Sequence, residues 1–281
     1  MKKSIKLTAL LCIIVSLVLL AASCSIVNTD GDERPVDPES DPRYDLIFFD
    51  DFNIFNPNVW VTDTGPRRGG YWHSDQVFVE DGNLTIRTSY ENGEFGSAYY
   101  TGCVSTDLLS GIPYGRYEIR FKTEHAPGYW SAIWLMQNGL GSNGNGARDG
   151  AEIDLMEIYG DDMYQHRIHI DSYGESNGYT IINNNLKDVW HKLVMEWTES
   201  RITFYMDDVK TWEVTDDYWI SRVNEGTFVI SCEINGEIVD GVPDPSKNAW
   251  IGVGNITGNG TDFSQDMLID YVKVYRINEQ A

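Results

Sequence analysis

The stretch AEIDLMEIYG, residues 151–160, places three carboxylates among apolar neighbours. If it forms a β-strand, Glu152 and Asp154 point to the same face, because side chains alternate with a period of two. Strict alternation would send Glu157 to the opposite face. A β-bulge at the pair Leu155-Met156 would correct this, because two residues then occupy the place of one. We therefore expect a bulged strand that presents all three carboxylates on one face.

This spacing is compatible with a catalytic pair. On a regular strand, Cα atoms four positions apart are separated by ~13 Å. Two Glu side chains that lean together approach the roughly 5 to 5.5 Å carboxyl separation of retaining glycosidases. Crowding and burial should also raise at least one carboxyl pKa, as a general acid at neutral pH requires.

The spacing by itself leaves three other interpretations open. The stretch could be a solvated acidic strand face, a calcium site or part of a helix. Calcium loops usually carry Asn, Asp and Gly between their ligands, whereas Ile, Leu and Met stand here. A helix would separate Glu152 and Glu157 by about 140° around its axis, so they would not share a face.

The chain from Leu46 onward consists of short segments of alternating, β-branched or aromatic residues, punctuated by Gly, Asn and Asp. No segment keeps a helical period beyond about two turns. The strongest strand patterns are VFVEDGNLTIRT (77–88), GRYEIRFKTE (115–124), WHKLVMEWTESRITFYMDDVKTWEV (190–214) and MLIDYVKVYRI (267–277). Regularly spaced strands without helices predict an all-β sandwich or barrel, formed by one domain over residues 45–281.

The first residues are organised like an export signal. Basic residues at the start precede an apolar run over 7–20, and the small residues 21–23 precede Cys24. The run is shorter than the roughly 20 apolar residues that span a membrane. Small residues before a cysteine resemble the bacterial lipobox, in which the signal is cut and the cysteine is lipidated. We therefore expect a lipoprotein signal peptide over 1–23, with ordinary secretion as the alternative, and a disordered acidic tether over 24–44.

Composition and charge limit the partners of this chain. Its 281 residues, 42% of them hydrophobic, are enough to bury one large core. It has 21 Lys and Arg against 43 Asp and Glu, a formal charge of −22. That balance excludes nucleic acid as a partner, because binding requires clustered basic residues against phosphate. Outside the signal and Cys24, Cys103 and Cys232 remain, either as a disulfide or as two buried thiols.

The run EIDLME resembles the bulged E-x-D-x-x-E signature of glycoside hydrolase family 16, found in its laminarinases, agarases and carrageenases. GYWSAIWLMQ (128–137) is similar to the Gly-x-Trp-x-Ala-x-Trp segment of the family, FFDDFN (48–53) to its opening strand and MLIDYVKVYR to its closing strand. The resemblance implies a concanavalin A-like β-jelly roll with a concave cleft. It also implies endo-acting, retaining hydrolysis of a β-linked polysaccharide, with no cofactor for catalysis.

Carried over position by position, the resemblance gives each carboxylate a role. It makes Glu152 the nucleophile, Asp154 the assisting acid and Glu157 the acid/base. All three residue types of the signature are present in this chain.

Three further residues are expected to bind the sugar chain. Trp130 and Trp134 stand four apart on a predicted strand and so share a face, and aromatic rings stack on the apolar faces of sugars. His169, in QHRIHIDSYG (165–174), occupies a position where relatives contact substrate, whereas His166 is out of phase with it. Ile-Asp after His169 departs from the His-x-Gly pattern of laminarinases, which leaves the precise substrate open.

The family also implies a structural calcium ion, remote from the cleft. The matching positions are Asp51 after the opening strand, Gly82 in a turn and Asp270 in the last strand. Two surface acids are the simpler interpretation of Asp51 and Asp270. A metal at this place would contribute to stability and not to the reaction.

We therefore expect a monomeric endoglycosidase acting on β-1,3-glucan or mixed-linkage β-1,3/1,4-glucan, held at the bacterial cell envelope or surface by a lipid in the outer or cell membrane. Two alternatives stay open. The substrate could be a galactan-type polymer, agar-like, carrageenan-like or from a host glycan. The chain could also be a non-catalytic carbohydrate-binding surface lipoprotein, because a fold by itself does not give a function.

Overall fold

The computed structural model describes residues 37–109, 114–124, 126–137, 151–159, 163–171, 173–182, 186–223, 226–247, 255–256 and 263–278. All of them belong to one compact unit, Glu33–Ala281. The predicted signal peptide, Cys24 and the tether up to residue 36 lie outside these ranges. Among the helices within them, none has the length and apolar content needed to cross a membrane.

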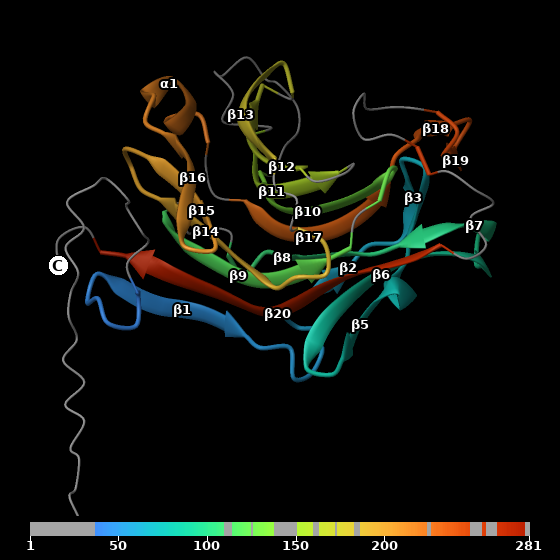
Figure 1. Ribbon diagram of the computed structural model, residues 1–281, viewed down its shortest axis with the longest axis horizontal. Coiled ribbons are helices and arrows are strands. Elements are labelled where there is room, and N and C mark those ends of the chain that lie inside the picture. Colours follow the sequence, from blue (N-terminus) through green and yellow to red (C-terminus); the bar gives the residue numbers. More distant parts are fainter. Residues whose placement is uncertain are drawn as a thin grey trace, which may run out of the picture. The chain divides into compact units, whose positions relative to one another are not determined.

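Among the described residues, the largest sheet has eleven strands, all antiparallel except for the pair β4 and β7 (Figure 1). Its order is β16 (Val209–Val214), β15 (Ile202–Met206), β14 (His191–Trp197), β9 (Gly115–Thr123), β20 (Ser264–Ile277), β6 (Asn83–Gly93), β7 (Gly96–Thr101), β4 (Gly70–Trp72) and β3 (Gly65–Arg67). In addition, β1 (Tyr44–Asp50) pairs with β20 and β5 (Val77–Glu80) with β6.

The second sheet has seven strands and carries the carboxylate motif on its third strand. Its order is β13 (Glu175–Ile182), β12 (Met163–Ile170), β11 (Glu152–Tyr159), β10 (Tyr129–Met136), β17 (Thr227–Ile234), β8 (Cys103–Thr106) and β2 (Val61–Thr62). A separate hairpin joins β18 (Glu237–Val239) to β19 (Val242–Asp244). The described helical segments are short, a 3-10 turn at Ser74–Gln76 and α1 at Asp217–Ile220. The predicted all-β sandwich is confirmed.

The core lies between the two sheets and follows the alternation expected from the sequence. In β9, Tyr117, Ile119 and Phe121 face the core. In β11, Ile153 and Ile158 do the same, on either side of the predicted bulge. The other face of the smaller sheet points away from the core. On β10 and β11 this outer face carries the three carboxylates and the two tryptophans.

The described end of the predicted tether contacts the domain. β1 begins at Tyr44, whose hydroxyl group donates a hydrogen bond of 2.9 Å to Glu196. Glu39 forms an ion pair of 2.9 Å with Lys273 of β20. Glu39 and Tyr44 therefore contact the folded domain through polar groups, next to the boundary expected at residue 45, and that boundary stays a prediction.

Cys103 and Cys232 are both buried free thiols. They lie on neighbouring strands, and the Cα partner of Cys103 is Ser231, one residue before Cys232. Their side chains point to opposite faces of the sheet, because residues alternate along a strand. Accordingly, Cys232 Sγ lies 3.0 Å from the Tyr129 hydroxyl, while Cys103 Sγ lies 3.7 Å from Asp63 Oδ2. The two cysteines are therefore separate buried thiols and do not form a disulfide in this structure.

Candidate active site

The bulge predicted at Leu155 and Met156 is present in β11. In the pairing with β12, Asp154 lies opposite Arg167 and Glu157 lies opposite Gln165. Between these two pairs, β11 advances by three residues while β12 advances by two. The register against β10 shifts at the same place. The bulge turns Glu157 to the face that carries Glu152 and Asp154, while the apolar residues between them stay in the core.

These three carboxylates line one cavity of about 1030 Å³ on the outer face of the smaller sheet. Trp130, Trp134 and His169 line it as well, so every catalytic and sugar-binding residue expected from the sequence reaches the same cavity. The two segments 66–68 and 236–238 form part of its wall. A cavity of this size, with converging acids and aromatic rings, is suited to hold several sugar units.

Glu157 is buried, and burial raises the pKa of its carboxyl group to about 7. The negative charge of Glu152 adds to this rise in pKa, while a hydrogen bond of 2.5 Å donated by Gln165 Nε2 opposes it. Gln165 is oriented in turn by Arg167, whose Nη2 donates to Gln165 Oε1 at 2.7 Å. Glu157 therefore keeps a proton near neutral pH and has a fixed orientation, as a general acid requires.

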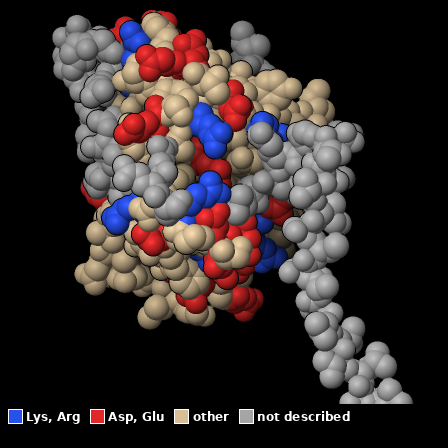
Figure 2. All heavy atoms as spheres, turned by 90° about the vertical axis from the view of Figure 1, so that its left-hand side faces the viewer, with Lys and Arg blue, Asp and Glu red and all other residues tan. Residues whose placement is uncertain are grey.

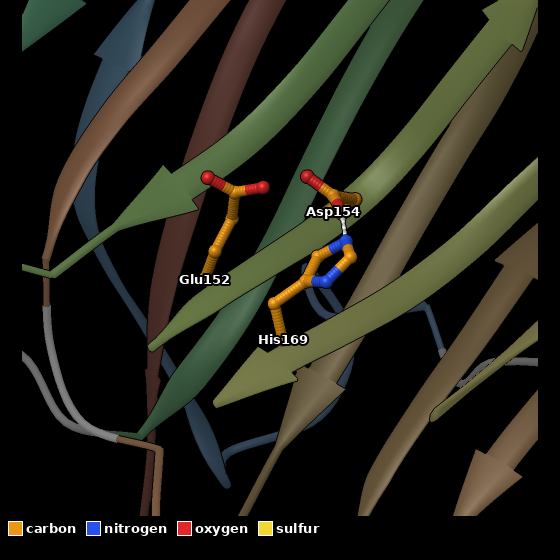
Figure 3. Close-up of side chains that lie close together, drawn as sticks. All are labelled: Glu152, Asp154 and His169. Carbon is orange, nitrogen blue, oxygen red and sulfur yellow. Dashed lines mark ion pairs between the residues drawn. The ribbon is translucent and has the colours of Figure 1, made fainter. Parts of the chain in front are cut away.

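Glu152, Asp154 and His169 form a close group (Figure 3). One carboxylate oxygen of each acid and one ring nitrogen of the histidine all lie within 4.8 Å of one another. Burial raises the pKa of Asp154 well above its usual range, and the charges of Glu157 and Glu152 add to this rise. Burial also raises the pKa of Glu152, but to a smaller extent, because a hydrogen bond with Asp154 opposes the rise. The pair is therefore arranged to share one proton, held on Asp154, which leaves the charge on Glu152.

His169 Nε2 lies 3.6 Å from Asp154 Oδ2, an oxygen that is buried and has no hydrogen-bond partner among the described residues. Burial lowers the pKa of His169 to about 4, so the ring is neutral at neutral pH. His166, on the opposite face of β12, is fully buried and contacts the Leu155 carbonyl and Thr211. Alternation along the strand thus places His169 in the cleft and His166 in the core, as their odd spacing in the sequence predicts.

A tyrosine that the sequence analysis did not single out completes the surroundings of Glu152. The hydroxyl group of Tyr173 donates a hydrogen bond of 2.8 Å to Glu152 Oε2. The Tyr173 ring also packs edge-on against His169, with centroids 5.0 Å apart. Tyr173 follows β12 in a turn, where strand alternation gives no guide to its direction.

The two tryptophans of β10 have different environments. Trp134 Nε1 donates a hydrogen bond of 3.1 Å to Ser231 Oγ on β17. Trp130 is almost fully buried, with the Arg68 guanidinium 4.4 Å from its ring centroid and Tyr159 edge-on at 5.5 Å. Trp134 is therefore the tryptophan with more exposed surface toward a sugar, and Arg68 lies over the ring of Trp130.

The wall of the cleft holds an ion cluster made of the half-buried Arg67 and Arg68 and the buried Glu233. Glu233 Oε1 accepts a hydrogen bond of 2.7 Å from Arg67 Nε, and Oε2 accepts one from Arg68 Nε. Both guanidinium groups lower the pKa of Glu233, so it stays ionised despite its burial. A single Glu in the apolar strand TFVISCEI was the available sequence signal for this cluster, and nothing local marked the two arginines.

Pairing of strands brings the predicted calcium positions to one place on the other sheet. β1 and β6 follow each other along the same edge of β20, since Asp50 pairs with Val272 and Leu84 with Ile269. Asp270 lies between these contacts at an irregularity in β20, so Asp51 and Gly82 border it. The Asp270 carboxylate forms an ion pair with Arg120. Strand register thus places the three positions near one another, the Asp270 carboxylate is partly neutralised by Arg120, and a calcium ion there stays a prediction.

Comparison with known proteins gives a consistent result. The family model described as glycosyl hydrolases family 16 matches residues 68–227. The β-glucanase of Rhodothermus marinus is 24% identical over 90% of this chain and 90% of its own length. The keratan-sulfate endo-1,4-β-galactosidase of Sphingobacterium multivorum is 28% identical over 83% of this chain and 56% of its own. The laminarinase catalytic domain of Thermotoga maritima superimposes with a TM-score of 0.66 at 24% identity, covering 83% and 98% of the two chains.

Proposed function

Since the chain belongs to glycosyl hydrolase family 16, we propose that it is a retaining endo-β-glucanase that cleaves β-1,3-glucan or mixed-linkage β-1,3/1,4-glucan. The β-glucanase of Rhodothermus marinus, which aligns along nine-tenths of both chains, supports this choice of polymer. The observation that carries the proposal is the bulge in β11, which brings Glu152, Asp154 and Glu157 together in one cleft.

In the first step, the Glu152 carboxylate attacks the anomeric carbon while Glu157 gives its proton to the leaving glycosidic oxygen. The new bond is an ester between Glu152 and the sugar, and the bond that breaks is the glycosidic C–O bond. Before reaction, burial raises the pKa of Glu157 to about 7 and so keeps its proton available. Burial also raises the pKa of Glu152, and the hydrogen bonds with Tyr173 and Asp154 oppose that rise and favour its ionised form.

In the second step, Glu157 is deprotonated and acts as the base. It takes a proton from water, whose oxygen attacks the anomeric carbon and releases the Glu152 carboxylate. Asp154 holds the shared proton and orients Glu152 in both steps. Two displacements at one carbon retain the β configuration of the product.

The aromatic and imidazole groups of the cleft support a role in sugar binding. Trp134 offers a partly exposed ring fixed by its hydrogen bond to Ser231, which suits stacking on a glucosyl face. His169 is neutral at the pH of reaction and lies beside Asp154, where it can exchange hydrogen bonds with a sugar hydroxyl group. Trp130 lies under Arg68, so we assign it to shaping the cleft together with that guanidinium.

The N-terminal sequence supports an exported, surface-held enzyme, and the charge of the surface gives no support to a nucleic-acid partner. Basic side chains on the face shown in Figure 2 are scattered singly among acidic ones, without a continuous basic patch. The lipobox-like residues before Cys24 support a lipid anchor in the bacterial envelope. Growth on radioactive palmitate followed by immunoprecipitation of wild type and Cys24→Ala would test this, and label retained by the variant would exclude the anchor.

The decisive test is digestion of laminarin, lichenan, agarose, carrageenan and xyloglucan by wild type, Glu152→Gln and Glu199→Gln. Glu199 is an exposed carboxylate in the turn after β14 and serves as the matched control. We expect oligosaccharides from laminarin or lichenan with wild type and Glu199→Gln, and none with Glu152→Gln. Release from agarose or carrageenan alone would overturn the glucan assignment. An initial α-anomer in the proton spectrum of the product would overturn the retaining mechanism.

A further inference from the structure

Tyr173 reaches the proposed nucleophile from outside the sheet. Its side chain is 49% exposed, yet its hydroxyl group donates a 2.8 Å hydrogen bond to Glu152 Oε2, which is buried in the cleft. The ring is fixed on its other side by the edge-on contact with His169. The residue therefore spans from solvent to the reacting carboxylate with contacts at both ends.

The backbone of this turn is held in a costly conformation. Asp171 and Tyr173 both have positive φ angles, 52° and 68°. A left-handed backbone is uncommon for a residue with a large side chain, and such strain is concentrated at functional sites. The amide of Gly174 closes the turn by donating 3.0 Å to the Asp171 carbonyl. A turn that merely joined β12 to β13 would have no need of a tyrosine at the strained position.

We propose that Tyr173 is a positioning residue, which holds the Glu152 carboxylate in its attacking orientation through the hydrogen bond from its hydroxyl group. This inference rests on the proposed glycosidase function. Tyr173 does not exchange its own proton during the reaction. It orients Glu152 for attack, and it stabilises the carboxylate that leaves when water releases the sugar from the ester.

The groups around Glu152 explain why a neutral donor is needed here. Asp154 lies beside it on β11 and His169 faces it from β12. Glu233 of β17, with Arg67 at the end of β3 and the following Arg68, lines the same cleft. Burial and the charge of Glu233 raise the pKa of Glu152, whereas the Tyr173 hydrogen bond, the Asp154 hydrogen bond and the charge of Arg67 lower it. Tyr173 supports the ionised form without adding a cation to the cleft.

The test compares Tyr173→Phe with wild type, and uses Tyr179→Phe as the matched control. Tyr179 lies on β13, is equally exposed, and pairs with core-facing His166, so it points away from the cleft. For Tyr173→Phe we expect kcat/KM to fall about 10- to 100-fold, the range for losing a hydrogen bond to a charged group. The acidic limb of the pH profile should move to higher pH, because Glu152 must be ionised. Acid-quenched reactions should contain more glycosyl-enzyme by mass spectrometry, because release from the ester is slowed.

Tyr179→Phe should match wild type in all three measurements. The proposal is overturned if Tyr173→Phe keeps the wild-type acidic limb, or if KM alone changes, which would make Tyr173 a sugar contact. A readout that needs no substrate separates this proposal from the proposed function. The Glu152 carboxyl carbon, identified by its absence in Glu152→Gln, is titrated by carbon NMR. If wild type hydrolyses no glucan, the function fails, while a higher pKa of Glu152 in Tyr173→Phe still supports its positioning and an unchanged pKa excludes it.

Discussion

Two clusters of buried carboxylates, one on β9 and β14 of the larger sheet and one on β11 of the smaller sheet, are stabilised by different partners. In the larger sheet, Arg116 is 1% exposed and donates to Glu118 at 2.8 Å and to Glu196 at 2.7 Å. In the cleft of the smaller sheet, Glu152 and Glu157 accept hydrogen bonds from neutral donors, Tyr173 and Gln165. A cation beside a buried carboxylate fixes its charge, whereas a neutral donor orients the carboxylate and lowers its pKa less, so that it can still exchange a proton.

The largest expected effect is loss of activity on removing the nucleophile without disturbing the fold. Glu152→Gln should lower kcat by about a thousandfold or more, since residues that act as a unit in covalent catalysis have effects of this size. Its free energy of unfolding at pH 7 should not fall, because ionising a carboxyl group whose pKa is raised by folding opposes the folded state above its unfolded pKa. Laminarin hydrolysis and urea unfolding of the same sample measure both. A large loss of stability would make Glu152 a structural residue.

The converse is expected in the larger sheet. Arg116→Met leaves Glu118 and Glu196 buried without their cation and should cost about 3–5 kcal/mol of unfolding free energy. The kcat of the molecules that remain folded should be unchanged. Arg87→Met serves as the control, because Arg87 and Asp266 form a partly exposed pair that should contribute about 1 kcal/mol or less. If urea denaturation gives equal losses of unfolding free energy for the two variants, Arg116 does not neutralise Glu118 and Glu196 as described.

A metal ion would be a further means of neutralising carboxylates, besides an arginine or a neutral donor, and the proposed calcium site beside β20 allows this to be tested. If Asp51, Gly82 and Asp270 bind calcium, an excess of a hundredfold over Kd should stabilise the fold by about 2.7 kcal/mol. Thermal unfolding in calcium and in chelator measures the shift, and Asp270→Asn should abolish it. Hydrolysis well below the melting temperature should be equal in both buffers. An identical melting temperature with and without calcium would exclude the site.

The smallest effect concerns the neutral donor to the acid/base. Gln165→Leu removes the hydrogen bond that lowers the pKa of Glu157, so this pKa should rise further above about 7. Since Glu157 must be protonated for the first step, the basic limb of kcat/KM should move to higher pH by about one unit or less. The pH profile of purified variant and wild type measures it. A limb that moves to lower pH would mean that Gln165 does not act on Glu157 as described.

Much of the site was predictable because strand alternation is a local rule. The phase of the three carboxylates required a bulge, and the register of β11 shows it between Asp154 and Glu157. Gln165 and Arg167 share the phase of His169, so the same rule places them in the cleft once His169 is assigned there. The core positions of β9 follow in the same way.

The remainder depended on contacts that no local pattern encodes. Arg67 meets Glu233 across 166 residues of sequence, because β3 and β17 approach each other only in the folded sandwich. The direction of Tyr173 is set by a left-handed turn, where alternation does not apply. The polar contacts of Glu39 and Tyr44 with the domain are likewise unmarked in the sequence, because the segment before β1 has little apolar surface to bury.

The placement of Cys103 and Cys232 on opposite faces of the sheet has a practical consequence for labelling. Burial raises the pKa of both thiols, so neither supplies much reactive thiolate at neutral pH. A cysteine introduced at an exposed position such as Tyr179 would therefore react with maleimide dyes before any native thiol in the described part of the chain. The folded domain can be given one fluorophore without first replacing these two buried cysteines, and binding of a long polysaccharide can then be followed by fluorescence anisotropy, which needs no dye beside the cleft.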